Sequence, residues 1–217
     1  LLADALLHAE RALALTDPQD RGETLRRTLQ AADLAIAAGD PQRGFDLVEP
    51  LIVALDDDEQ QPADAAAVLS LAGRARSGLF GSAAALPWLE RAAALLPAGS
   101  AERARQLGSC VWAMLFVDVD RARQRGIEFV AAAAASDDRL LDQFARAALN
   151  VADALAGLPL SSSPVPASTA LDTDVLNDWL EVAVWTDDHH RADAVLAEAM
   201  RRITERPSVT NEHNIMM

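Results

Sequence analysis

The chain has 217 residues, of which 51% are hydrophobic and 4% aromatic, and its formal net charge is −14. All 19 of its basic residues are arginine, so it lacks a P-loop lysine, a Schiff-base lysine and a lysine general base. An acidic surface without lysine argues against tight contact with DNA phosphates, and the single cysteine, Cys110, excludes a disulfide within the chain.

Apolar residues recur at helical spacing along most of the chain. Asp17-Pro18 and Asp40-Pro41 are helix-start signals, because the Asp oxygen caps free N–H groups and proline has no N–H to satisfy. Pro50 lies inside a predicted helix and should kink or break it. The apolar stripes of the first complete hairpin are Leu25, Leu29, Ala32 and Ile36 on one helix and Phe45, Val48, Ile52 and Leu55 on the other. Helices are expected over residues 1–15, 21–38, 42–55, 63–77, 100–117, 121–135, 138–156, 175–185 and 191–203, with one more that contains Pro87 and ends near 96.

The sequence repeats with a period of about 40 residues. At this offset the first helices of successive hairpins align Ala31, Leu71, Val111 and Val151, and also Ala35, Ala75, Leu115 and Leu155. The second helices align Ala14, Ala54, Ala94 and Ala134. A single hairpin cannot bury apolar stripes on both of its helices, whereas a stack of hairpins can. The sequence therefore predicts an all-α fold, an α-solenoid of helical hairpins with a concave inner face.

The repeat register fails at residues 157–170, which contain three prolines and a run of three serines. We expect a helical-repeat array over 1–157, a Pro/Ser-rich linker over 158–170, a further helical hairpin over 171–206 and an irregular tail over 207–217. The chain does not begin with methionine and is expected to be a piece of a longer protein. Its apolar runs are too short to span a bilayer, so no membrane contact and a cytoplasmic location are expected.

Few residue patterns suggest chemistry. Gly73 and Gly78 have P-loop spacing, but Leu79-Phe80 occupy the positions where Lys and Ser/Thr are needed, which excludes nucleotide binding there. His189 and Asp193 are four residues apart and could share a helix face as metal ligands do. A capped helix start is the preferred interpretation of this cluster, because no second ligand pair occurs elsewhere in the chain. The four tryptophans fit helix-packing positions better than a stacking platform. We expect no catalytic residue, metal or cofactor.

One polar column lies beside the apolar stripe of the first helices and could line the concave face. It consists of Arg26, Gln30, Ser70, Gln106, Cys110, Arg146 and Asn150. We predict that it binds a protein, a peptide or a small-molecule effector, and that Arg26 and Arg146 favour an anionic one because arginine grips carboxylates with two bonds. The alternative is that the column makes close helix–helix contacts through small residues, which is the commoner use of such positions.

The hairpins resemble tetratricopeptide-like repeats. Four segments carry a more specific resemblance: Leu34 to Asp40, Glu10 to Leu15, Glu90 to Ala92, and Ala183 to His189. They resemble the helical-repeat region of the large ATP-binding LuxR-type transcription regulators, the class similar to maltose-regulon activators. The resemblance implies a non-catalytic sensor module, without nucleic acid contact of its own, between an N-terminal ATPase module and a C-terminal helix-turn-helix. The alternative is a tetratricopeptide-type protein-interaction scaffold unrelated to transcription; an enzyme using His189 and His190 is the third hypothesis.

Overall fold

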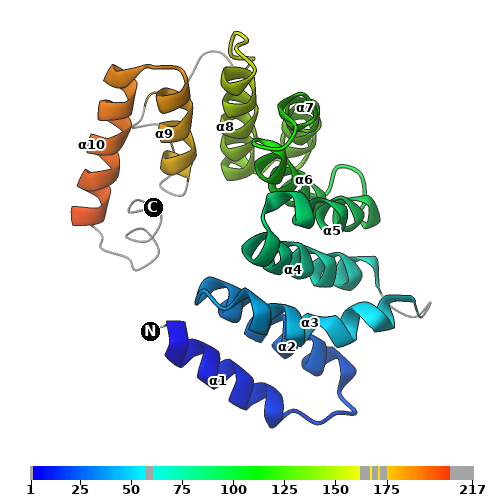
Figure 1. Ribbon diagram of the computed structural model, residues 1–217. Coiled ribbons are helices and arrows are strands. Elements are labelled where there is room, and N and C mark those ends of the chain that lie inside the picture. The colour runs from blue at the N-terminus through cyan, green and yellow to red at the C-terminus, as the bar shows by residue number, and fades with distance from the viewer. Residues whose placement is uncertain (1, 57–60, 162–166, 168–170, 172–174, 206–217) are drawn as a thin grey trace. The chain divides into compact units, whose positions relative to one another are not determined.

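The computed structural model describes residues 2–56, 61–161, 167, 171 and 175–205. All regular structure in these residues is helical, and each helix packs against the next one within its unit (Figure 1). The predicted all-α fold with helices paired along the chain is therefore confirmed. The predicted tail, 207–217, and much of the predicted linker lie outside the described residues. No helix in the described part is long and apolar enough to cross a membrane.

The chain divides into two compact units, Leu1–Ala98 and Gly99–Met217. The helices of the first unit are α1 (Leu2–Ala14), α2 (Arg21–Ala37), α3 (Pro41–Val53), the short 3₁₀ turn η1 (Ala54–Asp56), α4 (Pro62–Phe80) and α5 (Ser82–Leu95). Besides the contacts between neighbours along the chain, α2 also packs against α4. The first helices of its two complete hairpins therefore lie in contact.

The second unit repeats this arrangement. Its helices are α6 (Ala101–Met114), α7 (Val119–Ala135), α8 (Arg139–Leu155), α9 (Leu176–Trp185) and α10 (His189–Glu205). The first helices α6 and α8 are in contact, as α2 and α4 are in the other unit.

The apolar stripes of the first hairpin form a shared core, as predicted. Ala32 and Val48 are fully buried, and the other six predicted stripe residues pack against the same cluster. The aligned residues Ala31, Leu71, Val111 and Val151 are all buried too. The periodicity thus identified the buried face of the first helices. It did not do so for the second helices, where the aligned residues Ala14, Ala94 and Ala134 are exposed and Ala54 is half-buried.

Carboxylate caps start several helices. Asp40 accepts a hydrogen bond from the Arg43 N–H at 3.0 Å, so α3 begins at Pro41 as the Asp-Pro signal predicted. The signal at Asp17-Pro18 lies a few residues before the helix that follows it: α2 begins at Arg21, as the expected range 21–38 had it, and is capped by Asp20. The Asp17 side chain instead accepts a hydrogen bond from the Gln19 N–H and so stabilises the turn that precedes α2.

Other features of the helices also differ from the prediction, two of them for local reasons. The helix α3 continues through Pro50 to Val53 before it tightens into η1, so this proline does not break it. The helix α6 ends at Met114, earlier than predicted, because Val117 and Asp118 both donate their backbone N–H groups to the Met114 carbonyl and close a turn.

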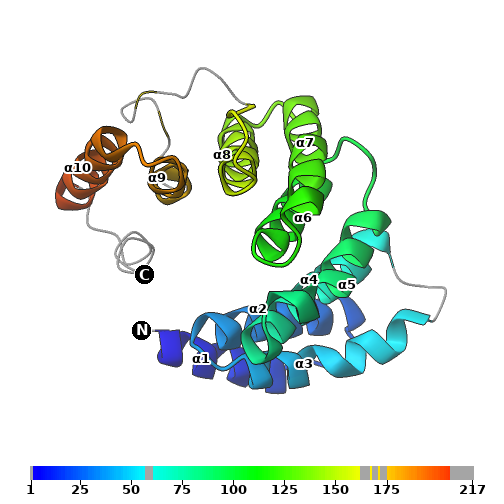
Figure 2. The same cartoon turned by 45° about the horizontal axis from the view of Figure 1, so that its top comes forward.

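The break after α8 is where the predicted register needs correction. Helix α9 begins 37 residues after α8 begins, close to the spacings of 41, 39 and 38 residues between the starts of α2, α4, α6 and α8. It lies beside α8 and runs in the same direction (Figures 1 and 2). The spacing of the first helices is therefore retained, and what the described residues between Leu155 and Val175 lack is the second helix of a hairpin.

Candidate functional site

The predicted polar column is divided between the two units. Arg26 and Gln30 lie on α2 and Ser70 on α4, while the second unit carries Gln106 and Cys110 on α6 and Arg146 and Asn150 on α8. Ser70, Cys110 and Asn150 are buried, so they contact neighbouring helices and not solvent. Arg26 and Gln30 are exposed, and Gln106 and Arg146 are exposed in part. Direct contact with a partner is thus open to these four side chains.

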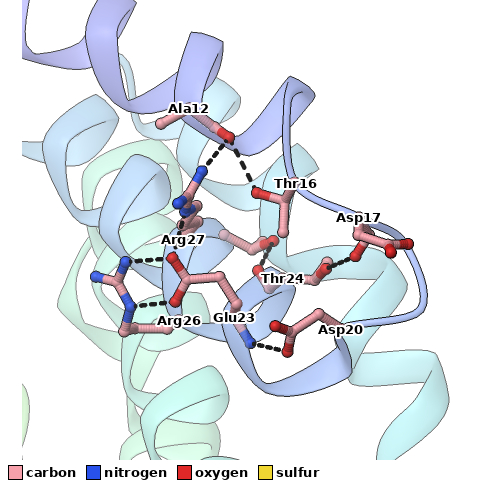
Figure 3. A network of polar contacts seen from close by, with 9 residues as sticks. Ala12, Thr16, Asp17, Asp20, Glu23, Thr24, Arg26 and Arg27 are labelled. Atoms are coloured by element: carbon pink, nitrogen blue, oxygen red, sulfur yellow. Dashed lines mark hydrogen bonds and ion pairs between the residues drawn. The ribbon is translucent and has the colours of Figure 1, made fainter.

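Arg26 is held by a carboxylate on its own helix (Figure 3). Its Nε and Nη2 atoms each donate to one oxygen of Glu23 at 2.7 Å. Arg27 donates to the same carboxylate through Nε at 2.5 Å. These hydrogen bonds from Arg26 and then Arg27 lower the pKa of Glu23 to about 2, and Glu23 in turn raises the pKa of Arg26.

The two arginines beside Glu23 have different neighbours. Arg27 also donates from Nη1 to the Ala12 carbonyl at 2.6 Å, and the Thr16 hydroxyl donates to that same carbonyl at 2.9 Å. Since this carbonyl lies in the last turn of α1, Arg27 ties α1 to α2 and satisfies a helix-end acceptor. Arg26 has no such structural bond in Figure 3, and its side chain is 61% exposed. It is therefore the one of the two that a partner can reach.

Arg146 has a similar local pairing. Its Nε donates to Asp142 Oδ2 at 2.8 Å, which raises the pKa of Arg146, and its side chain is 42% exposed. Ion pairs this exposed contribute only about 0–1 kcal/mol, because water screens them. An incoming carboxylate can therefore take the place of Asp142, or of Glu23 at Arg26, at little cost.

The glycines with P-loop spacing lie inside α4 and are packing positions. A Cβ on Gly73 would lie 2.8 Å from Leu89 Cδ2, and one on Gly78 would lie 2.9 Å from the Pro41 Cβ. Both glycines thus allow a neighbouring helix to approach closely.

The Asp-Asp-His-His segment forms a capped turn. Asp188 accepts from the Arg191 N–H at 3.0 Å, and the helix begins at His189, earlier than predicted. Asp187 adopts a left-handed φ of 57° and lies 3.0 Å from His189 Nε2. Among the residues that the structure describes, no three His, Cys, Asp or Glu side chains are grouped so that they could hold a metal ion.

A buried carboxylate that the sequence analysis missed lies at the end of α8. Asp153 is fully buried and accepts hydrogen bonds from Arg123 Nε on α7 and from the Ser161 backbone N–H, both at 2.7 Å. It therefore fixes the first residues of the Pro/Ser-rich segment against α7 and α8. An Asp in a helix of mixed composition carries no local signal of such a role.

The tryptophans do not all behave as predicted. Trp179 is buried, and Trp88 packs against the core of the first unit. Trp185 is instead 44% exposed and contacts Phe116, which is 73% exposed. Both rings lie at the end of a helix next to a turn, and that position is the only sequence signal for their exposure.

A scan against models of known protein families found no match for this chain, and searches of curated proteins and of solved structures found none either.

Proposed function

We propose that this chain is a non-catalytic binding and sensing module of a LuxR-type transcription regulator. In this proposal its hairpins are tetratricopeptide-like repeats with a period of about 40 residues, stacked as an α-solenoid. The sequence resemblance supports the regulator class. The even spacing of the first-helix starts, from Arg21 to Leu176, supports the repeat.

One observation carries the proposal most directly: first helices of successive hairpins touch each other, α2 with α4 and α6 with α8. In stacked hairpins, such contacts bury one side of each first helix and leave a neighbouring edge available to a partner. The buried members of the polar column, Ser70, Cys110 and Asn150, fit the first role. The exposed arginines at its ends fit the second.

The proposed partner is an anionic effector, either a peptide or protein segment or a small molecule with carboxylate groups. Arg26 in the first unit and Arg146 in the second can each grip a carboxylate with two bonds, and Gln30 and Gln106 supply neutral hydrogen-bonding groups in their respective units. In the proposal this segment works in the cytoplasm, binds no cofactor and touches no nucleic acid itself. DNA binding and ATP binding belong to the flanking modules that the resemblance implies.

The test is a titration of the intact regulator with its effector, using Arg26→Glu, Arg146→Glu and the double variant. We expect each single variant to weaken binding and the double variant to weaken it further, while circular dichroism shows unchanged helix content. Arg43→Glu is the matched control, because Arg43 is also an exposed arginine paired with a glutamate, Glu10, but lies on a second helix. Binding that survives both changes in folded protein would move the site away from this column.

A further inference from the structure

Two turns of the second unit carry exposed apolar side chains, and an aromatic ring from one is in contact with a ring from the other. Phe116 and Val117 follow α6, and Val184 and Trp185 end α9. All four are exposed, by 73%, 49%, 57% and 44% respectively. The rings of Phe116 and Trp185 are 6.1 Å apart between centroids and inclined by 53°. We call these four residues the Phe116–Trp185 patch.

Exposed aromatic rings in contact are typical of binding surfaces, where Trp and Phe are enriched and often contribute most of the affinity. The Trp185 ring is also oriented, because its Nε1 donates to Glu181 Oε2 at 3.0 Å. A ring held in this way loses little conformational freedom when a partner packs on it.

The charges around the patch are negative. Residues 115–120 and 181–188, which contain it, hold five carboxylates and no arginine, and Arg121 follows directly, its backbone N–H donating to Asp118 Oδ1 at 3.1 Å. Asp188 is paired with Arg191, and Asp187 lies beside His189, but the Asp187 side chain remains 90% exposed.

The negative charge around the patch favours one class of binding partner over another. A second copy of the chain would bring another net charge of −14 and would be repelled. A cationic segment would be attracted by the carboxylates, and its Arg or Lys groups would also interact favourably with the faces of the two rings.

We propose that the Phe116–Trp185 patch docks an arginine- or lysine-rich segment of a partner protein, which seats an apolar side chain on the two rings and places its cations beside Glu181, Asp187 and Asp118. The inference rests on the proposed binding role of the chain. It does not depend on the arginine column, so charge reversal at Arg26 and Arg146 leaves it unchanged.

The test uses the whole chain and a fluorescein-labelled amphipathic peptide of leucine and arginine at helical spacing. Two matched peptides have Glu in place of Arg, or Ser in place of Leu. Fluorescence anisotropy should show binding of the first peptide only, and binding should weaken as salt is raised. The double variant Phe116→Ser/Trp185→Ser should lose at least about tenfold in affinity, while Trp185→Phe keeps most of it.

Two single variants complete the design. Phe80→Ser removes a comparably exposed ring, 62% exposed and stacked on Arg76, from the other unit, and should leave binding unchanged. Asp187→Asn removes one carboxylate charge but keeps a residue that tolerates the left-handed φ at this position. It should weaken binding of the basic peptide and make that binding less dependent on salt.

Four results would overturn the proposal: no binding of the basic peptide, equal binding of the Glu or Ser peptide, full binding by the folded double variant, or a wild-type dimer that the double variant abolishes. The last result would identify the patch as a contact between copies of the chain. If the Arg26 and Arg146 variants lose effector binding but still bind the basic peptide, the arginine column and the Phe116–Trp185 patch are independent sites.

Discussion

The fully buried carboxylate of Asp153 offers the sharpest test of the packing in the second unit. Replacing Arg123 by Met removes the charged partner at 2.7 Å but retains most of the apolar stem of the side chain. The carboxylate would then keep only the Ser161 N–H as a donor. Leaving a buried charge without its ion-pair partner costs about 3–5 kcal/mol.

The Arg123 side chain is 35% exposed, so water can enter the space that the guanidinium leaves. We therefore place the expected loss in the free energy of unfolding at the lower end, about 3 kcal/mol. Asp153→Asn keeps the size and an acceptor oxygen for Ser161 and should cost less, about 1–2 kcal/mol. The double variant Arg123→Met/Asp153→Leu has no buried charge and should be less destabilised than the sum of its single variants.

Urea unfolding followed by tryptophan fluorescence is the assay, because Trp112, Trp179 and Trp185 all lie in the second unit. The matched control is Arg105→Met, which removes an exposed pair with Asp138 at 3.3 Å and should change stability by less than about 0.5 kcal/mol. If Arg123→Met costs no more than this control, the burial argument is refuted.

Further predictions concern helix contacts and one titrating group. Gly44→Ala should lower the free energy of unfolding by about 1–3 kcal/mol, since its Cβ would lie 2.5 Å from Ile36 Cγ1. Gly22→Ala should stabilise α2 by up to about 1 kcal/mol, because its Cβ would meet only Asp20 Oδ1, at 3.8 Å; urea midpoints test both. Ala75→Leu should destabilise by about 1–3 kcal/mol, because Ala75 is fully buried, and an unchanged melting temperature would contradict the predicted column. Burial, and then the nearby Glu181 charge, raises the pKa of Asp178 to about 7. Between the ordinary pKa of Asp, about 4, and pH 7, the folded state therefore binds a proton at Asp178 that the unfolded state has lost. The free energy of unfolding should accordingly fall by a few kcal/mol as pH rises from about 4 to 7. Asp178→Asn should remove this fall in melting curves taken across the range.

The sequence was informative where structure depends on local pattern. The stripes from Leu25 to Leu55 and the Asp40-Pro41 start were predictable, because a helix places every third or fourth residue on one face and a cap acts over three residues. The pairing of Arg26 with Glu23 follows the same local rule, since residues three apart on a helix are neighbours.

Features set by contacts between distant segments could not be predicted. The period placed Gln30 and Asn150 in the same column, but Gln30 is exposed and Asn150 fully buried, because the depth of a column depends on which helices cover it. The bond from Ser161 to Asp153 and the contact of Phe116 with Trp185 join separate segments that have no common pattern. The prolines and serines after Gly157 indicated a break, and the structure confirms the predicted start of the next helix, so that α9 keeps the first-helix spacing across it.

The most direct test of the central claim is the nucleotide sequence of the complete reading frame that encodes this segment. The proposal predicts a P-loop ATPase module encoded upstream and a helix-turn-helix encoded downstream in the same frame. A frame that encodes neither module would contradict the assignment to a LuxR-type regulator and leave an interaction scaffold as the interpretation of these hairpins.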